Sequence, residues 1–426
     1  MTRIGIVGLG YVGLTTSVGL AQLGHQVLGY DLEASRVNLL LTSKPPIHEE
    51  GLEQSLGRLI KSNALSFTNH LEDLQSFKPE FVFVCVGTPQ DESGAADLRI
   101  LNSAAQEVAP ALPAGGIMII KSTVPVGTCQ KIAQSLNRTD LLVASNPEFL
   151  REGTAIKDFM EPDRIVVGAN SPEVAKKVMS LYDAIDSPKL ETSLESSELI
   201  KYAANAYLAM RLSFTNDIAN LAEATKANVD EVLFGMGLDK RIGNSFLKPG
   251  PGWGGSCFPK DTSALVSIAK SYDSRLPLVE SAIASNQAAL TRSADVIEGL
   301  VGGDLANKTV AIWGVAFKAN TDDVRDSPSL KIIDILLKRG ATVKGFDPIA
   351  RAPEQAGLSM VSSALEATSG ADILAILTEW PEFSEVSPEL VAAGMKAPVV
   401  YDARRILPES WRPHFSVFRV LGEASR

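Results

Sequence analysis

The sequence predicts an α/β protein built from three consecutive parts, and three observations lead to this prediction. Residues 1–192 alternate short apolar runs with helical patterns, which is typical of a parallel sheet covered by helices. Residues 193–300 carry apolar residues at helical spacing and no strand-like run, so we expect a central all-helical domain with a long connecting helix. Strand–helix alternation restarts near Asn307, which predicts a second, smaller open α/β domain over residues 301–426.

Buried strands are predicted where a short apolar run ends in turn or polar residues. In the first domain these runs lie at 3–8, 26–31, 81–87, 116–122 and 141–147, and residues 162–168 add a last strand before a helix at 171–185. The helical domain is expected over 193–226 and from about 262 to about 300. The last domain should have strands at 308–317, 341–347, 371–380 and 397–404. Ligands bind at the carboxyl edge of such sheets, so the polar residues after these runs are candidate site residues.

The composition narrows the class of protein. Of 426 residues, 45% are hydrophobic and 21% are charged, as in a soluble globular protein. The net charge of −10 argues against a nucleic-acid surface, which needs a basic stripe. The three cysteines lack metal-ligand spacing, so we predict no metal site and expect a reducing compartment. The first strand pattern leaves no room for a signal peptide, and no apolar run is long enough for a membrane span, which together predict a cytoplasmic protein.

A glycine motif follows the first predicted strand. Residues 8–13 read GLGYVG, in which Gly8 permits the tight turn, Gly10 admits a pyrophosphate and Gly13 allows close helix–strand packing. Asp31 ends the second strand, where a carboxylate accepts both ribose hydroxyls and repels a 2′-phosphate. This predicts a Rossmann domain that prefers NAD to NADP, although Arg36 could offset the charge of Asp31. A Rossmann-like domain for FAD or another nucleotide is the alternative.

Two further segments carry candidate chemistry. Lys201 and Asn205 are four residues apart on one helix face, where they could stabilise an oxyanion, or could be a solvated lysine and a core or capping asparagine. Residues 248–261 read KPGPGWGGSCFPKD, a loop whose backbone can approach a ligand closely. Cys257 in this loop, near Lys260, is a candidate nucleophile, and the alternative is a small buried hydrophobe. Cys85 and Cys129 lie in apolar or helical patterns and fit that second description.

The chain resembles the UDP-glucose/GDP-mannose 6-dehydrogenase family along nearly its whole length. Ten segments match in family order: GLGYVG, VCVGTP, STVPVGT, SNPEFLREG, PDRIVVG, KYAANAYLA, DKRIG, GPGWGGSCFPKD, GVAFKANTDDVRDSP and LTEWPEF. The resemblance implies a four-electron oxidation of a sugar nucleotide with NAD, through a thiohemiacetal and a thioester on Cys257. It implies that Lys201 and Asn205 support oxyanion charge and that Asp261 assists an active-site water. Glu148 matches the carboxylate tied to base work and thioester hydrolysis, and Thr123 matches a hydroxyl that orders water.

The resemblance also implies the remaining binding residues. Those matching the NAD site are Gly8, Gly10, Tyr11, Val12, Gly13, Asp31, Arg36, Thr88, Pro89, Ser122, Thr123, Glu152, Lys260 and Arg325. Those matching the nucleotide-sugar site are Glu148, Phe149, Leu150, Glu152, Lys157, Lys201, Asn205, Arg241, Phe246, Leu247, Lys248, Gly254, Phe317 and Lys318. Arg241 matches an arginine that reaches the active site of a neighbouring subunit, which implies a homodimer with the helical domain as interface.

The choice of substrate depends on finer features of the same segments. Ser256, where amino-sugar enzymes of the family tend to have histidine, favours the glucose or mannose branch, and the other motifs look more like bacterial UDP-glucose enzymes. GDP-mannose remains the alternative substrate. A two-electron β-hydroxyacid dehydrogenase would lack Cys257 and residues 305–426, and a non-catalytic nucleotide-sugar sensor would have lost a catalytic group. The sequence departs mildly from the family pattern at two places. Residue 217 is Asp217 where glutamate is usual, and the segment YDAR, which ends at Arg404, stands where DGR is usual.

Overall fold

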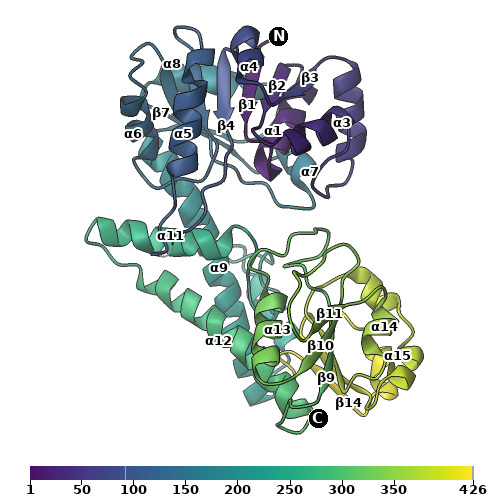
Figure 1. Ribbon diagram of the computed structural model, residues 1–426. Coiled ribbons are helices and arrows are strands. Elements are labelled where there is room, and N and C mark those ends of the chain that lie inside the picture. The colour runs from purple at the N-terminus through teal and green to yellow at the C-terminus, as the bar shows by residue number, and fades with distance from the viewer. Residues whose placement is uncertain (92, 425–426) are drawn as a thin grey trace. The chain divides into compact units, whose positions relative to one another are not determined.

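The computed structural model describes residues 1–91 and 93–424 and contains two compact units (Figure 1). The first unit comprises Met1–Ala204 and Ser263–Ser274, and the second comprises Asn205–Thr262 and Arg275–Arg426. Helices α9 (Leu194–Thr225) and α11 (Phe258–Ser271) each contribute residues to both units. The three-part division at residues 192 and 300 therefore stays a prediction.

The first unit is built on an eight-stranded sheet with the order β3-β2-β1-β4-β5-β6-β7-β8. Its strands are β1 (Arg3–Val7), β2 (Gln26–Tyr30), β3 (Leu65–Thr68), β4 (Phe81–Val84), β5 (Ile117–Ile120), β6 (Leu142–Ser145), β7 (Ile165–Ala169) and β8 (Lys189–Thr192). The six apolar runs predicted as strands all contain one. The short strands β3 and β8 were not predicted, and β8 is mostly exposed, so it lacks the apolar run that marks a buried strand.

One feature of this sheet corrects the expectation of a parallel arrangement. Strands β1 to β6 are parallel to their neighbours, whereas β7 runs antiparallel to β6. A parallel pair needs a crossover that returns the chain to the opposite edge. The segment 146–164, which contains only the six-residue helix α7 (Ala155–Met160), instead enters β7 from the carboxyl edge. Arg164, just before β7, consequently lies at the same edge as the residues that follow β6.

Alternation along the strands divides the core of the first unit into two layers. Ile4, Ile6 and Phe83 belong to one buried cluster, whereas Val82 and Val84 belong to another. Successive strand residues point to opposite faces, so both faces are apolar and both are covered by helices (Figure 1). The helices are α1 (Tyr11–Gln22), α2 (Ala34–Leu41), α3 (Leu52–Lys61), α4 (Leu71–Phe77), α5 (Arg99–Val108), α6 (Thr128–Ser135), α7 and α8 (Pro172–Met179).

The second unit holds a six-stranded parallel sheet with the order β11-β10-β9-β12-β13-β14. Its strands are β9 (Thr309–Trp313), β10 (Thr342–Phe346), β11 (Leu358–Met360), β12 (Ile373–Ile376), β13 (Val399–Asp402) and β14 (Val417–Val420). Its own helices are α10 (Val229–Gly237), α12 (Pro277–Leu300), α13 (Pro328–Lys338), α14 (Ala364–Thr368) and α15 (Pro388–Gly394). The four strands expected here are present, and the edge strands β11 and β14 are additional. Among the described residues, no helix is long and apolar enough to cross a membrane.

Candidate active site

The glycine motif leaves an open helix N-terminus in the first unit. Gly8 has a φ of 86°, and a Cβ on Gly13 would lie 1.8 Å from the carbonyl oxygen of Gly8, so α1 packs directly on the end of β1. A Cβ on Gly10 would have nothing within 4 Å, so the backbone there is open to a ligand. The free N–H groups and positive dipole end of α1 therefore face a space that suits a pyrophosphate.

Asp31 lies beside this motif at the end of β2. Its Oδ2 accepts the N–H of Leu9 at 2.6 Å, and its Oδ1 accepts the N–H of Glu33 at 2.9 Å. The guanidinium of Arg36 lies 2.8 Å from Oδ2 and 2.7 Å from the carboxylate of Glu33. The carboxylate is thus fixed next to the glycine loop, and the guanidinium of Arg36 offsets part of its negative charge.

The loops after β4 and β5 are held together by hydroxyl groups. The hydroxyl of Thr88 donates to the carbonyl of Thr123 at 2.8 Å, and that of Ser122 donates to the carbonyl of Val86 at 2.6 Å. The carbonyl of Pro89 accepts the N–H of Asp97 at 2.8 Å. Four predicted site residues, Thr88, Pro89, Ser122 and Thr123, are therefore brought together at the carboxyl edge of neighbouring strands.

Glu148 is a buried carboxylate at the same edge. Its Oε1 accepts the N–H groups of Phe149 at 2.5 Å and Leu150 at 2.8 Å. Its Oε2 lies 3.1 Å from the ammonium of Lys121, which is also buried. No helix begins here, because α7 starts at Ala155, so these contacts come from a loop that wraps around the carboxylate. The sequence did not single out Lys121, because a lysine after a strand reads as a surface residue.

Two cations of the first unit lie near the ring of Phe149. The guanidinium carbon of Arg164 lies 3.8 Å from the ring centroid, and the ammonium of Lys201 lies 5.2 Å from it. Lys201 is buried on α9, so it is not the solvated lysine of the alternative interpretation. Burial lowers the pKa of Arg164, and Asp163 opposes that effect. Arg164 was missed in the sequence because its position depends on the reversed direction of β7.

A second loop, which contains Glu152, follows Glu148. The N–H of Gly153 donates to the hydroxyl of Tyr11 at 2.8 Å and to the carboxylate of Glu49, whose other oxygen accepts the N–H of Ala155 at 3.0 Å. The predicted residue Tyr11 thus connects the glycine motif to this loop. Lys157, on α7, is exposed.

In the second unit, three predicted residues form a chain of contacts. The amide of Asn205 donates to Oδ2 of Asp261 at 2.6 Å, and the ammonium of Lys260 donates to Oδ1 of the same carboxylate at 2.6 Å. Asp261 is fully buried and Asn205 nearly so. Asn205 is therefore neither a cap nor an apolar-core residue. The ammonium of Lys260, predicted to bind cofactor, pairs with Asp261 instead of standing free.

Cys257 is distinguished from the other two cysteines by its exposure. All three lie in the described part of the chain; Cys257 is exposed, whereas Cys85 and Cys129 are buried. Burial raises the pKa of Cys85 to about 12, and burial raises that of Cys129 well above its ordinary value. Cys257 precedes the first residue of α11, and its sulfur lies 3.6 Å from the hydroxyl oxygen of Ser256. It is an accessible thiol immediately before the N-terminus of a helix.

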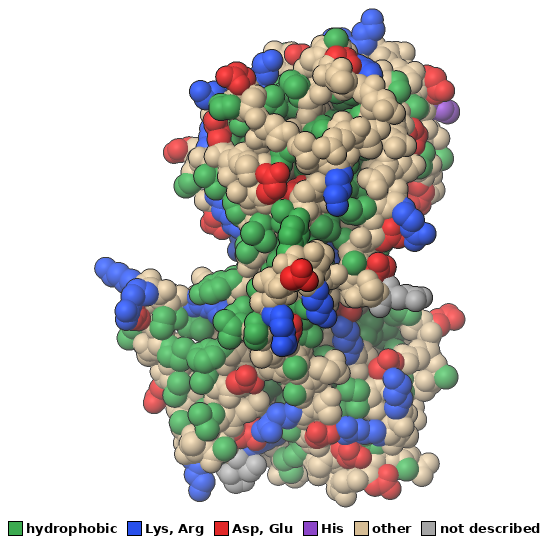
Figure 2. All heavy atoms as spheres, turned by 90° about the vertical axis from the view of Figure 1, so that its left-hand side faces the viewer, with side chains coloured by type: hydrophobic (Ala, Val, Ile, Leu, Met, Phe, Trp, Pro, Cys, Tyr) green, Lys and Arg blue, Asp and Glu red, His purple; other side chains and the backbone are tan. Residues whose placement is uncertain are grey.

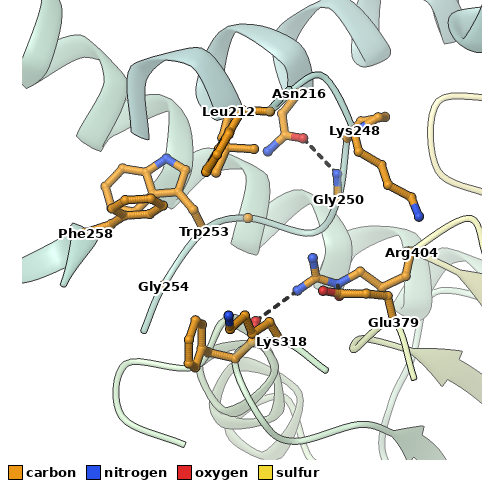
Figure 3. Close-up of a pocket in the computed structure, with 14 residues that line it drawn as sticks. Leu212, Asn216, Lys248, Gly250, Trp253, Gly254, Phe258, Lys318, Glu379 and Arg404 are labelled. Atoms are coloured by element: carbon orange, nitrogen blue, oxygen red, sulfur yellow. Dashed lines mark hydrogen bonds and ion pairs between the residues drawn. The ribbon is translucent and has the colours of Figure 1, made fainter. Parts of the chain in front are cut away.

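A cavity of about 260 Å³ opens beside the Gly/Pro-rich loop of the second unit (Figure 3). Five of its lining residues were predicted as substrate-binding: Phe246, Lys248, Gly254, Phe317 and Lys318. The sequence missed the others, Leu212, Asn216, Pro249, Gly250, Gly252, Trp253, Phe258, Glu379 and Arg404. The predicted residue Leu247 is buried next to the wall but does not line it. Gly254 must be glycine, since a Cβ there would lie 2.1 Å from the carbonyl oxygen of Asp326.

Arg404 projects into this cavity from the turn after β13 (Figure 3). Asp402 forms that turn by accepting the N–H groups of Arg404 and Arg405 on one oxygen and two more N–H groups on the other. The guanidinium of Arg404 lies 3.2 Å from Glu379 and donates to the carbonyl of Leu377 at 2.7 Å. The segment YDAR therefore contributes a cation to the cavity, despite its departure from the family pattern.

Two predicted arginines lie elsewhere in the second unit. Arg241 is exposed and pairs with Asp239 at 2.6 Å. The largely exposed side chain of Arg325 pairs with Asp323 at 2.7 Å. Neither lines the cavity, so their predicted roles as a residue for a neighbouring subunit and as a pyrophosphate ligand stay predictions.

Comparison with known proteins agrees with the geometry of both units. Three models of the UDP-glucose/GDP-mannose dehydrogenase family match in order: the NAD binding domain over residues 2–186, the central domain over 195–288 and the UDP binding domain over 311–409. A UDP-glucose 6-dehydrogenase of Rhizobium meliloti (strain 1021) is 41% identical over 417 residues, 95% of either chain. The UDP-glucose 6-dehydrogenase TuaD of Bacillus subtilis (strain 168) is 40% identical over 419 residues, 95% of this chain and 90% of the relative.

A solved structure extends the comparison to three dimensions. The UDP-glucose dehydrogenase of the hyperthermophilic archaeon Pyrobaculum islandicum superimposes with a TM-score of 0.91 at 36% identity, covering 100% of this chain and 98% of that one. The arrangement of the two sheets agrees with this match. The chain therefore belongs to the UDP-glucose/GDP-mannose dehydrogenase family and is an NAD-dependent oxidoreductase.

Proposed function

We propose that this protein oxidises the primary alcohol of UDP-glucose to the carboxylate of UDP-glucuronate. The overall reaction consumes two NAD and one water per sugar and yields two NADH and three protons. The observation that carries this proposal is Cys257, an exposed thiol at the start of α11 and in the same loop that forms the wall of the cavity. A dehydrogenase that stops at the aldehyde needs no nucleophile, whereas oxidation to a carboxylate uses one to retain the aldehyde.

The residues of the first unit fit NAD. The open backbone at Gly10 and the N-terminus of α1 suit the pyrophosphate, and the fixed carboxylate of Asp31 suits the adenosine ribose. NAD, when bound, supplies the acceptor for each of the two hydrides. It would be surrounded by Tyr11 and Val12, at the start of α1, and by Thr88 and Ser122, in loops at the same sheet edge.

Cys257 supplies the covalent step. After the first oxidation its thiolate adds to the aldehyde carbon, and the carbonyl oxygen becomes the alkoxide of a thiohemiacetal. Loss of the second hydride from that carbon leaves a thioester on the sulfur. Lys201, with its ammonium, and Asn205, with its amide, would stabilise the negative oxygen that each of these steps creates.

Hydrolysis releases the product. Water adds to the thioester carbon, its proton passes to a base, and the bond to sulfur breaks to regenerate the Cys257 thiolate and leave the uronate. We assign the base role to Glu148. Asp261, which holds Asn205 and Lys260, assists the water, and Thr123 orders it. The sugar and its phosphates would be bound by Lys157, Glu152, Phe149 and Leu150.

The cavity of the second unit suits a pyrophosphate and a base. Lys248, Lys318 and Arg404 bring three cations to its lining, and Phe246 and Phe317 bring aromatic surface. The match of residues 311–409 to a UDP binding domain supports uracil as the base. The names of the relatives, UDP-glucose 6-dehydrogenases, support glucose as the sugar.

We further propose a homodimer that works in the cytoplasm. Tyr207, Phe214 and Leu221 on α9 are at least half exposed and repeat every seven residues, which puts them on one side of the helix. Phe234 on α10 and Leu238, which directly follows this helix, are more than 60% exposed as well. Such apolar surface is typical of an interface, and Arg241, near the end of α10, would reach the partner's active site as the family resemblance implies.

The proposed reaction is tested by counting NADH released per sugar with a panel of UDP- and GDP-sugars. We expect UDP-glucose to give the highest kcat/KM, two NADH per sugar and no free aldehyde. One NADH per sugar with aldehyde in solution would contradict the four-electron reaction. Faster turnover of GDP-mannose would keep the reaction but change the substrate.

A further inference from the structure

The buried lysine next to Glu148 has no part in the reaction as described so far. Lys121 follows β5 directly and Asn146 follows β6, and because Ile120 pairs with Ser145 these two residues lie side by side at the sheet edge. The ammonium of Lys121 is 3.1 Å from Oε2 of Glu148 and 3.3 Å from Oδ1 of Asn146. Its side chain is only 5% exposed, so water cannot replace either contact.

Asn146 is the centre of the network that holds this lysine. Its Oδ1 also accepts the hydroxyl of Tyr182 at 2.7 Å, and its amide donates to the carbonyl of Val166 at 2.8 Å. Lys121, Asn146 and Tyr182 are all at least 95% buried. One partner of the ammonium, Asn146, is therefore itself held in place by contacts with β7 and with the segment after α8.

Three titratable groups face Lys121: Glu148, Tyr182 and Cys85. Burial raises the pKa of Tyr182 to about 12 and that of Cys85 to about 12, so both are neutral at the pH where enzymes work. Glu148 is then the counter-ion of Lys121 among the described residues. Burial by itself lowers the pKa of Lys121, but the charge of Glu148 raises it above its ordinary value overall.

Removing water from a carboxylate favours its protonated form, and a neighbouring cation favours the anion. Glu148 is buried, yet as a base it must be ionised to take a proton from water. We infer that Lys121 is a positioning residue that keeps Glu148 ionised and holds its carboxylate in place for hydrolysis of the Cys257 thioester. This inference rests on the proposed function, because it assumes that Glu148 is the base.

The test compares pH profiles of kcat for the wild type and Lys121→Met, with NAD and UDP-glucose. Without the cation, Glu148 should protonate at higher pH, so the acid side of the profile should move up by roughly one unit or more. Below that pH, mass spectrometry should find the sugar adduct accumulating on Cys257. Lys121→Arg, which keeps the charge, should restore the wild-type profile. A lysine that only fills space would lower stability in the Met variant without moving the profile.

A second variant covers the case in which Lys121→Met does not fold. Asn146→Asp keeps the oxygen that accepts from Lys121 and Tyr182 but adds a second negative charge beside the ammonium. It should move the acid side of the profile in the same direction by a smaller amount. An unchanged profile in every folded variant of the two overturns the inference.

Glu148→Gln separates this inference from the proposed function. It should accumulate the Cys257 adduct at every pH, because no base remains to be ionised. If Glu148→Gln turns over normally, the base assignment is wrong and the role of Lys121 falls with it. If Glu148→Gln stalls while the Lys121 and Asn146 variants keep the wild-type profile, the role of Lys121 alone is wrong.

Discussion

At the scale of single residues, three strand-end aspartates have different roles in the structure. Asp31 ends β2 and keeps its carboxylate at the glycine motif, beside Arg36. Asp347 ends β10, the equivalent strand of the second sheet, but is fully buried and accepts from four backbone N–H groups and the indole of Trp380. Asp402 ends β13 and accepts four N–H groups. Asp347 and Asp402 thus serve to hold backbone turns, whereas Asp31 lies within residues 2–186, which match the family's NAD binding domain.

The residue-scale prediction concerns Cys257. Changing it to serine keeps the size of the side chain but replaces the thiol with a much poorer nucleophile at neutral pH. Formation of UDP-glucuronate should fall by at least about 10³-fold, while the melting temperature and the Kd for UDP-glucose stay close to the wild type. Product formation is followed by chromatography.

The matched control is Cys129→Ala, a buried cysteine with no proposed role. It should keep normal turnover per folded molecule, even if it is less stable. Full activity of Cys257→Ser would show that Cys257 has only a structural role and would contradict the covalent mechanism.

At the scale of elements, the Gly/Pro-rich loop before Cys257 is fixed by two helices of the second unit. Asn286 on α12 accepts the N–H of Trp253 at 2.8 Å and donates to its carbonyl at 2.9 Å. Asn216 on α9 accepts the N–H of Gly250 at 2.9 Å, and Ser213 on the same helix accepts the indole N–H of Trp253 at 2.9 Å. A loop with little regular structure thus has a defined path up to the nucleophile.

We predict that Asn286→Ala disturbs catalysis as well as folding. It leaves the buried N–H and carbonyl of Trp253 without their partner, which should lower the free energy of unfolding by roughly 2 kcal/mol or more. Because the loop leads to Cys257, kcat should fall about 10- to 100-fold at temperatures where the variant is folded. Urea unfolding and initial rates of NADH formation measure the two effects.

Gln287→Ala is the control on the same helix, since Gln287 is exposed. It should change neither quantity. Normal kcat in folded Asn286→Ala would show that the loop keeps its path without this clamp.

At the scale of the whole molecule, the side chains on the surface bear on the choice of partner. On the face drawn in Figure 2, lysine and arginine side chains are interspersed with aspartate and glutamate side chains, and the chain as a whole carries a net charge of −10. The large exposed apolar side chains of α9 and α10 are the stronger indication of a partner, and a second copy of the chain is the partner we propose.

The prediction at this scale is that Phe214→Glu weakens the dimer. A charge in the middle of the apolar row on α9 would have to be buried without a partner on association. Sedimentation velocity should show the wild type as a dimer and the variant shifted toward monomer at micromolar concentration. Lys338→Glu, an exposed charge reversal on α13, is the control and should remain dimeric. A wild type that sediments as a monomer would contradict the proposal.

The sequence by itself determined the fold class, the family and the cofactor. Short apolar runs that end in polar residues indicate buried strands, and the spacing from the glycine motif to Asp31 indicates the cofactor, because both depend on local geometry. The short edge strands β8 and β14 were not predicted, because a strand at the edge of a sheet needs no apolar run. The sequence distinguished Cys257 from Cys85 and Cys129, because Cys257 alone of the three has loop-forming neighbours in the sequence.

Only the tertiary structure decided which charges meet. The reversal of β7 brings Arg164 onto Phe149, the pairing of β5 with β6 brings Lys121 next to Asn146 and Glu148, and the turn at Asp402 sends Arg404 into the cavity. Each of these contacts joins residues far apart in the chain or depends on a strand direction. Sequence spacing carries no information on long-range contacts or on strand direction. Once the fold has formed, however, a buried charge needs a partner, because burying it alone costs free energy.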